Sequence, residues 1–261
     1  MRTHTSLYLD LLRFIAAFLV FIFHMGYFSG VYIPVIGRLG TEAVIVFFVI
    51  SGLVISFSAD QKHSDIIDFM ISRLARLWSV VLPALLVTLI ADKLGQAINL
   101  SAYSPLQALP FWKWPILLIA NAFFVSQIWN FNLWPGTNGP FWSISYEFWC
   151  YCIFASIFYM RGRLRIIMFF AILFFVGPQI VISFPAWMAG SVAYFFLRKN
   201  DGIRTRDGLL LWAGAIVGLF LYAYFDVASY LRAFFPELND YAKWEIDFWP
   251  KTYIISFFFR N

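Results

Sequence analysis

The stretch LDLLRFIAAFLVFIFH, residues 9–24, decides the fold class. It is apolar almost throughout. Together with its neighbours it forms an apolar run of about 20 residues, the length that a membrane-spanning helix needs. Three ionisable side chains interrupt it, namely Asp10, Arg13 and His24. A signal peptide does not carry such charges in its apolar core, and no small-residue cleavage site follows. The stretch therefore predicts a first transmembrane helix that stays in the protein.

The rest of the chain has the same apolar character. Of its 261 residues, 62% are hydrophobic and only 13% are charged, whereas a soluble domain has about 25% charged residues. A folded globule of this length cannot remove so much apolar surface from water. The composition excludes a soluble enzyme, a disordered chain and a disulfide scaffold. We expect a single polytopic helical domain over residues 1–261, in which Cys150 and Cys152 are small buried residues.

Eight apolar segments are candidates for membrane spans. The seventh of them is short, so we expect it to be tilted, broken or partly interfacial. A ninth apolar stretch, residues 248–259, is cut short by the end of the chain. The sequence thus predicts an all-α transmembrane bundle of about eight complete spans plus a truncated ninth. The eight candidates are residues 7–28, 41–57, 74–91, 109–128, 141–160, 164–182, 184–197 and 209–225.

The basic residues predict how the chain is oriented. With a cytoplasmic N-terminus, strict alternation of the spans leaves the basic segments 161–165 and 198–206 outside, against the positive-inside rule. An even number of crossings between residues 109 and 141 puts both segments inside. The stretch between residues 109 and 141 contains WNFNLWPGTNGP, residues 129–140, which has no charge and several Asn, Pro and Gly residues. This stretch is interpreted as a re-entrant or unwound segment, or else as an ordinary polar loop.

Charged groups inside the first predicted span are candidates for function, because each costs about 2.5–3.5 kcal/mol to insert into a membrane. Arg13 and His24 are separated by three helical turns, so they share one face of the helix at two depths about 16 Å apart. Asp10 is close enough in sequence to pair with Arg13. The structural alternative is that Arg13 reaches the membrane surface and that His24 caps the outer end of the helix.

Arg73 and Arg76 stand at the head of the third predicted span. One helical turn apart, they project the same way, and paired guanidinium groups suit the binding of phosphate. The structural alternative is a basic cluster that only sets the topology, and without further context that alternative is favoured.

A polar stripe is expected where the sequence reads SISYEFWCY, residues 143–151. Ser143, Glu147 and Tyr151 follow an i, i+4, i+8 spacing and so share one helix face. A capping box needs a carboxylate three residues after the Ser, which neither Ser143 nor Ser145 has. A carboxylate among aromatic residues is hard to explain structurally, so a functional role is favoured for Glu147.

These pieces together resemble the acyltransferase 3 family of integral-membrane acyltransferases, which mostly modify extracytoplasmic carbohydrates in bacteria. The chain has the Arg-x10-His spacing within residues 9–24, FFVISGLVI at residues 47–55, the RxxR element at residues 73–76 and SxSxE-x3-Tyr at residues 143–151. Two departures stand out. Leu11 replaces the usual glycine of the first motif, and the chain is shorter than is usual in the family.

The resemblance implies transfer of an acyl group, usually acetyl, from cytoplasmic acyl-CoA to a sugar hydroxyl on the far side of the membrane. It implies that His24 is the catalytic base or a transient acyl carrier and that Arg13 binds or polarises the donor. By the same resemblance, Arg73 and Arg76 bind the CoA phosphates. Glu147 would then orient His24 or the acceptor, supported by Asp10, Ser143, Ser145 and Tyr151.

The expected partners are acyl-CoA as a co-substrate, a carbohydrate or glycolipid acceptor and the lipid bilayer, without nucleic acid. No bound cofactor is expected, and no metal, because the sequence has no His/Cys cluster with metal-ligand spacing. The expected location is the cytoplasmic (inner) membrane of a bacterium, with several passes and a cytoplasmic N-terminus. Two other hypotheses remain: a membrane carrier that uses the buried charges to move a substrate, and an inactive truncated remnant of the family.

Overall fold

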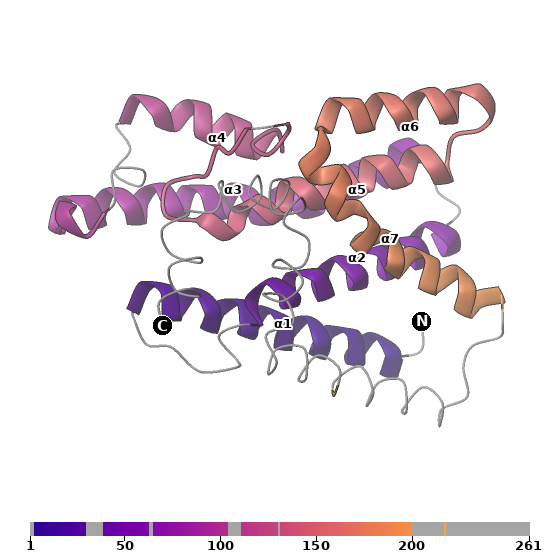
Figure 1. The fold of residues 1–261 in the computed structure, drawn as a ribbon, viewed down its shortest axis with the longest axis horizontal. Coiled ribbons are helices and arrows are strands. Elements are labelled where there is room, and N and C mark those ends of the chain that lie inside the picture. The colour runs from indigo at the N-terminus through magenta and orange to yellow at the C-terminus, as the bar shows by residue number, and fades with distance from the viewer. Residues whose placement is uncertain are drawn as a thin grey trace, which may run out of the picture. The chain divides into compact units, whose positions relative to one another are not determined.

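The computed structural model describes residues 3–29, 39–62, 65–103, 111–129, 131–199 and 217. Within these ranges every regular element is a helix, which confirms the all-α prediction (Figure 1). The predicted segments 209–225, apart from residue 217, and 248–259 lie outside the described residues. The α-helices are α1 (Thr3–Ser29), α2 (Gly40–Lys62), α3 (Ile66–Ile98), α4 (Trp114–Ala122), α5 (Trp142–Phe158), α6 (Gly162–Val176) and α7 (Pro178–Lys199).

Four of the described helices are long and apolar enough to cross a membrane. Their apolar parts are Leu7–Met25, Glu42–Lys62, Ile66–Ile98 and Pro178–Lys199. Large hydrophobic side chains lie exposed along them, as Phe14, Phe18 and Phe21 do on α1. Such a surface is stable against lipid and not against water. The chain is therefore a helical membrane protein, although the predicted number of eight to nine spans is not confirmed.

The predicted span over residues 109–128 is not one continuous helix. It contains a short 3-10 turn, Phe111–Lys113, and then α4, which has 9 residues. At 1.5 Å per residue, α4 is about 14 Å long, against about 30 Å for the hydrocarbon core of a bilayer. From Phe123 to Asn138 the described backbone is irregular. This course of the chain is consistent with both alternatives for residues 129–140, the re-entrant or unwound segment and the ordinary polar loop.

The boundary predicted near residue 182 is wrong, and Gly177 is the reason. This residue has φ +79°, a conformation that glycine adopts without strain and other residues rarely adopt. α6 stops directly before it and α7 begins directly after it, at Pro178. Consequently the seventh predicted span is not short, because α7 has 22 residues and carries Pro185 within it.

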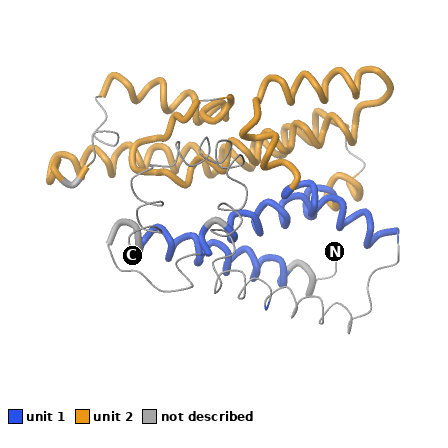
Figure 2. The backbone as a smooth tube through the Cα atoms, viewed as in Figure 1, with its two compact units in different colours: residues 1–56, 186–261 blue, residues 57–185 orange. Residues whose placement is uncertain are grey.

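The described chain forms two compact units (Figure 2): unit 1 takes in the described residues of 1–56 and 186–261, and unit 2 those of 57–185. In unit 2, α3 packs against α4 and α5, and α5 packs against α6. α3 and α5 are antiparallel: near the start of α3, Phe69 contacts Tyr159, just after α5, with ring centres 5.2 Å apart. At the other end, Asp92 of α3 binds Thr137, which shortly precedes α5.

In unit 1, α2 and α7 approach closely. A Cβ added at Gly52 would overlap the carbonyl oxygen of Trp187, and one added at Gly190 would overlap that of Val49. Two buried hydrogen bonds accompany this contact: Ser56 Oγ donates to Ser191 Oγ at 2.7 Å, and Trp187 Nε1 donates to Ser51 Oγ at 3.2 Å. The small residues Ser51 and Gly52 of α2 therefore allow close helix packing.

Candidate functional site

Arg73 is a buried cation near the start of α3. Only 7% of the residue is exposed. Its Nη2 donates a hydrogen bond to Ser58 Oγ at 3.2 Å, and its guanidinium carbon lies 5.6 Å from the centre of the Phe69 ring. A guanidinium over an aromatic face is stabilised by the negative charge of the ring face. Burial of this charge is costly unless an anion pairs with it.

α5 contributes a carboxylate and a phenol to the same region. The hydroxyl of Tyr151 donates a hydrogen bond to Oε1 of Glu147 one turn earlier, as the i, i+4 spacing predicts. Both groups lie within electrostatic range of Arg73, as does Arg76. The contact between α3 and α5 thus brings two cations, one carboxylate and one phenol together. Arg76 itself is exposed, so the two arginines differ in how easily water reaches them.

The two serines of the motif bind elsewhere. Ser143 Oγ donates to the carbonyl oxygen of Pro140 at 3.1 Å, within the turn that starts α5. Ser145 Oγ lies 2.8 Å from Ser126 Oγ, and both residues are buried. These bonds fix the start of α5 to the irregular segment beside it. The observed partners of Ser143 and Ser145 are structural, and their predicted support of catalysis stays a prediction.

The remaining predicted site residues lie on α1, in the other unit. Arg13 Nη1 donates to Oδ1 of Asp10 at 3.0 Å, which confirms the predicted pair. His24 Nδ1 donates to the carbonyl oxygen of Val20 at 2.8 Å. A carbonyl only accepts, so Nδ1 carries the proton, and in the neutral ring Nε2 keeps its lone pair. The convergence of His24 with Glu147 stays a prediction.

A buried polar cluster at the far end of α3 was not predicted from the sequence. Asp92 is 2% exposed and accepts two hydrogen bonds from Thr137: one from the backbone N–H at 2.8 Å and one from the hydroxyl at 2.6 Å. Asn138 Nδ2 donates to Thr88 Oγ1 at 2.9 Å. Gly136 lies so close that an added Cβ would overlap the Asp92 carboxylate. The cluster fastens the irregular segment to α3.

The sequence does carry a signal for this cluster. Asp92 follows directly after the predicted span 74–91, whereas α3 continues to Ile98. A carboxylate on a continuing helix needs hydrogen-bond donors, and Thr137 of the stretch GTNG supplies two of them, its backbone N–H and its hydroxyl.

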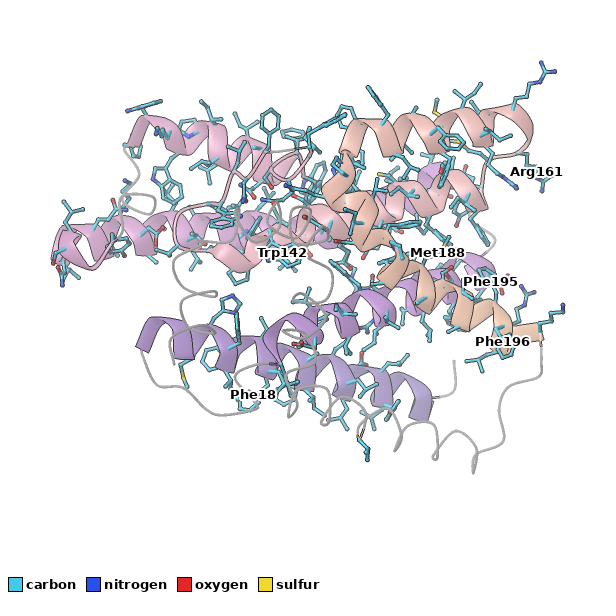
Figure 3. All side chains as sticks on the ribbon, viewed as in Figure 1. Phe18, Trp142, Arg161, Met188, Phe195 and Phe196 are labelled. Carbon is cyan, nitrogen blue, oxygen red and sulfur yellow. The ribbon has the colours of Figure 1, made fainter. Side chains whose placement is uncertain are left out.

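Figure 3 shows the side chains along the helices, with Trp142 at the start of α5 and the exposed Arg161 at the turn between α5 and α6.

Among the residues that the structure describes, no group of three or more His, Cys, Asp or Glu side chains is placed to hold a metal ion. The chemistry available at the α3–α5 contact is thus that of a buried guanidinium beside a carboxylate and a phenol: binding an anion and orienting hydrogen-bond partners.

Comparisons with known proteins place these groups in context. A family model described as an acyltransferase domain, that of the acyltransferase 3 family, matches residues 6–259. An O-acetyl transferase of Shigella phage Sf6 is 29% identical over 212 residues, which is 74% of this chain. The match covers 61% of the phage protein, so the chain spans about three fifths of the length of this relative. No solved structure matches the chain.

Proposed function

Because the chain belongs to the acyltransferase 3 family, we propose that it is a membrane-embedded O-acyltransferase. It moves an acyl group from cytoplasmic acyl-CoA to a hydroxyl of an extracytoplasmic carbohydrate or glycolipid. The family match over residues 6–259 is the observation that carries this proposal. The name of the phage relative, an O-acetyl transferase, favours acetyl as the acyl group.

The donor binds at the contact between α3 and α5. Arg73 and Arg76 are one turn apart on α3, and guanidinium groups bind phosphate oxygens with short, charge-assisted hydrogen bonds. The burial of Arg73 with no ion pair at that residue among the described parts of the chain supports this role. Exposed Arg76 attracts the anionic donor from water, and buried Arg73 holds it.

His24 is the base in this proposal. Its hydrogen bond to the carbonyl oxygen of Val20 leaves Nε2 free to accept a proton. Nε2 takes the proton of the acceptor hydroxyl, whose oxygen attacks the thioester carbonyl and forms a tetrahedral oxyanion. When the intermediate collapses, the carbon–sulfur bond breaks and the thiolate takes the proton from the imidazolium. The products are an O-acyl ester and CoA-SH, and neither metal nor ATP is consumed.

Glu147 and Arg13 assist at the two sides of this step. Glu147, held by the hydroxyl of Tyr151, orients His24 or the acceptor and stabilises the imidazolium. Arg13, paired with Asp10, contributes positive charge toward the donor. These roles follow the family motifs and the charges of the groups.

The proposed location is the cytoplasmic membrane of a bacterium, with the N-terminus in the cytoplasm. The antiparallel course of α3 and α5, with α4 too short to cross, supports an even number of crossings between these two helices. With this orientation the basic turn at Arg161 and the end of α7 at Arg198 and Lys199 are cytoplasmic, in agreement with the positive-inside rule.

Release of CoA-SH tests this proposal. Inside-out membrane vesicles from cells that express the chain expose the cytoplasmic face to added acetyl-CoA, and a thiol reagent measures the CoA-SH formed. We expect release from vesicles with the wild type, and at least about tenfold less with Arg73→Ala, since a charge-assisted bond to the donor is lost. Ser156→Ala, which removes a hydroxyl that donates to the carbonyl oxygen of Ile153 in the same helix, is the matched control.

A membrane carrier is the second candidate function. The irregular segment within residues 123–138, packed into the unit that also holds Arg73 and Glu147, is the observation that favours it, because unwound backbone lines substrate paths in transporters. A carrier moves its substrate without consuming acyl-CoA. Vesicles in which the wild type releases no CoA-SH above the background of cells without the chain would therefore favour the carrier over the acyltransferase.

A further inference from the structure

Two hydrogen-bond donors near the start of α3 are buried without a partner. Nε of Arg73 and the hydroxyl of Tyr159 are both inaccessible to water, and neither has a hydrogen-bond partner among the described residues. Tyr159 follows directly after α5 and was not part of any sequence motif singled out above. Buried polar groups are satisfied in nearly all native structures, so a pair of unsatisfied donors indicates a missing acceptor.

The two donors belong to one neighbourhood. Phe69 contacts both residues: its ring centre is 5.6 Å from the Arg73 guanidinium carbon and 5.2 Å from the centre of the Tyr159 ring. Tyr159 is also one of the groups within electrostatic range of Arg73. Both unpartnered donors therefore belong to residues that contact the same aromatic ring, near the start of α3.

The missing acceptor is an anion. Arg73 makes one hydrogen bond, to Ser58, and no carboxylate of the described residues lies within ion-pair distance of it. Arg76, one turn away, adds a second positive charge that raises the cost of leaving Arg73 unneutralised. Water would satisfy the two donors but would not neutralise the charge. A phosphate group does both, because its oxygens are strong acceptors and carry negative charge.

We propose that the hydroxyl of Tyr159 and Nε of Arg73 together bind a phosphate group of the acyl donor. This inference rests on the proposed function, since it assigns the phosphate to acyl-CoA rather than to a phospholipid headgroup. Because Arg73 is buried and Arg76 is exposed, the two arginines have different roles. The Arg73–Tyr159 pair binds the phosphate, and Arg76 attracts the acyl donor from solvent. Tyr159 thus binds the acyl donor and does not act on the reacting carbonyl.

Tyr159→Phe is the decisive variant, because it removes one hydroxyl and keeps the ring that packs on Phe69. The probes are inorganic pyrophosphate and CoA-SH, titrated into the full chain in phospholipid-free detergent. We expect Kd for both probes to rise about tenfold or more, the effect of one hydrogen bond to a charged group. In turnover, KM for acetyl-CoA should rise while kcat stays within about twofold. Tyr194→Phe, the same change on α7, is the control and should leave Kd unchanged.

The outcomes separate this inference from the proposed function. Unchanged Kd values in Tyr159→Phe, with CoA-SH still bound by the wild type, overturn the inference and leave the acyltransferase intact. Pyrophosphate binding that depends on Tyr159, without any CoA-SH binding, keeps the phosphate site and overturns the proposed donor. Displacement of pyrophosphate by phosphatidylglycerol, but not by CoA-SH, shows a headgroup site and also overturns the donor assignment. Arg73→Lys, which keeps the charge and loses Nε, should weaken both probes as Tyr159→Phe does, so the inference stays testable if Tyr159→Phe fails to fold.

Discussion

At the scale of single residues, the account depends on local bonds that set what each group can do. The hydrogen bond from His24 to Val20 determines which ring nitrogen carries the proton. The hydroxyl of Tyr151 holds one oxygen of Glu147 in place. Both bonds join residues one helical turn apart, so the helix alone positions the two partners.

Glu147→Gln tests whether the negative charge takes part in the reaction. The amide keeps the shape of the side chain and still accepts a hydrogen bond from Tyr151, but it cannot stabilise an imidazolium. We expect the rate of acyl transfer to fall about 10²-fold or more, the lower range for loss of acid–base assistance, with little change in Kd for CoA-SH. Ser156→Ala should transfer at the wild-type rate. Wild-type transfer by Glu147→Gln would contradict the assigned role.

Asp92→Ala tests the buried cluster at the far end of α3. The substitution leaves the backbone N–H and the hydroxyl of Thr137 without their acceptor, and each buried group left unsatisfied costs about 1–3 kcal/mol. We expect the free energy of unfolding to fall by about 3 kcal/mol. Asp65→Ala, which removes the exposed cap of α3, should cost only about 1 kcal/mol. Both are measured by unfolding in detergent, and equal losses would count against a structural role of the cluster.

Local spacing explains which parts of the site the sequence could predict. The pairs Asp10–Arg13 and Glu147–Tyr151 follow from the helical repeat alone. The bond from Thr137 to Asp92 joins residues 45 apart in sequence, and the helical repeat says nothing about such pairs. The contact of Tyr159 with Phe69 has the same character, because it depends on the packing of α5 against α3.

At the scale of elements, hydropathy located the helices and misplaced some of their ends. A continuous apolar run hides the break at Gly177, although Gly followed by Pro is a recognised signal for the end of one helix and the start of the next. α4 shows the reverse error: an apolar stretch of spanning length contains a helix of only 9 residues. Bilayer hydropathy measures the solvent that a segment prefers and not the continuity of its helix.

The crossing of α2 and α7 provides a test at the same scale. Gly52→Ala and Gly190→Ala each place a methyl group against a backbone carbonyl of the other helix, so the helices must separate and lose packing. We expect each substitution to lower the free energy of unfolding by about 1–3 kcal/mol, the usual cost of overpacking.

Gly139→Ala is the control for this test, because no described atom beyond the neighbouring residues lies within 4 Å of the added Cβ. Its effect on unfolding in detergent should be within about 0.5 kcal/mol. Gly52 and Gly190 variants that unfold like Gly139→Ala would contradict the close helix crossing.

At the scale of the whole molecule, the orientation in the membrane decides which side supplies the donor. The start of α3 carries Arg73 and Arg76, and the proposed cytoplasmic N-terminus places this end inside. Ser101 follows the opposite end of α3 and is exposed, so it should lie outside. The basic turn at Arg161 is expected on the same side as Arg73, because Tyr159 contacts Phe69 near the start of α3.

Cysteine labelling tests this orientation. Single cysteines at position 101, 161 or 199, in a chain whose Cys150 and Cys152 are replaced by Ala, are exposed to a maleimide that does not cross membranes. We expect Ser101→Cys to react in intact cells, and Arg161→Cys and Lys199→Cys to react only after the membrane is opened. Labelling of Arg161→Cys in intact cells would show the opposite orientation and would contradict an acyl-donor site on the cytoplasmic side.

The most direct test of the central claim is the amount of ester-linked acyl group on the cell-surface carbohydrate. The wild-type chain and His24→Ala are expressed in a bacterial host without other members of the family, and mild alkali releases the esters as free acetate for quantification. Acetate should be present with the wild type and should fall to the host background with His24→Ala. Equal amounts of acetate from the two strains would contradict an acyltransferase that works through His24.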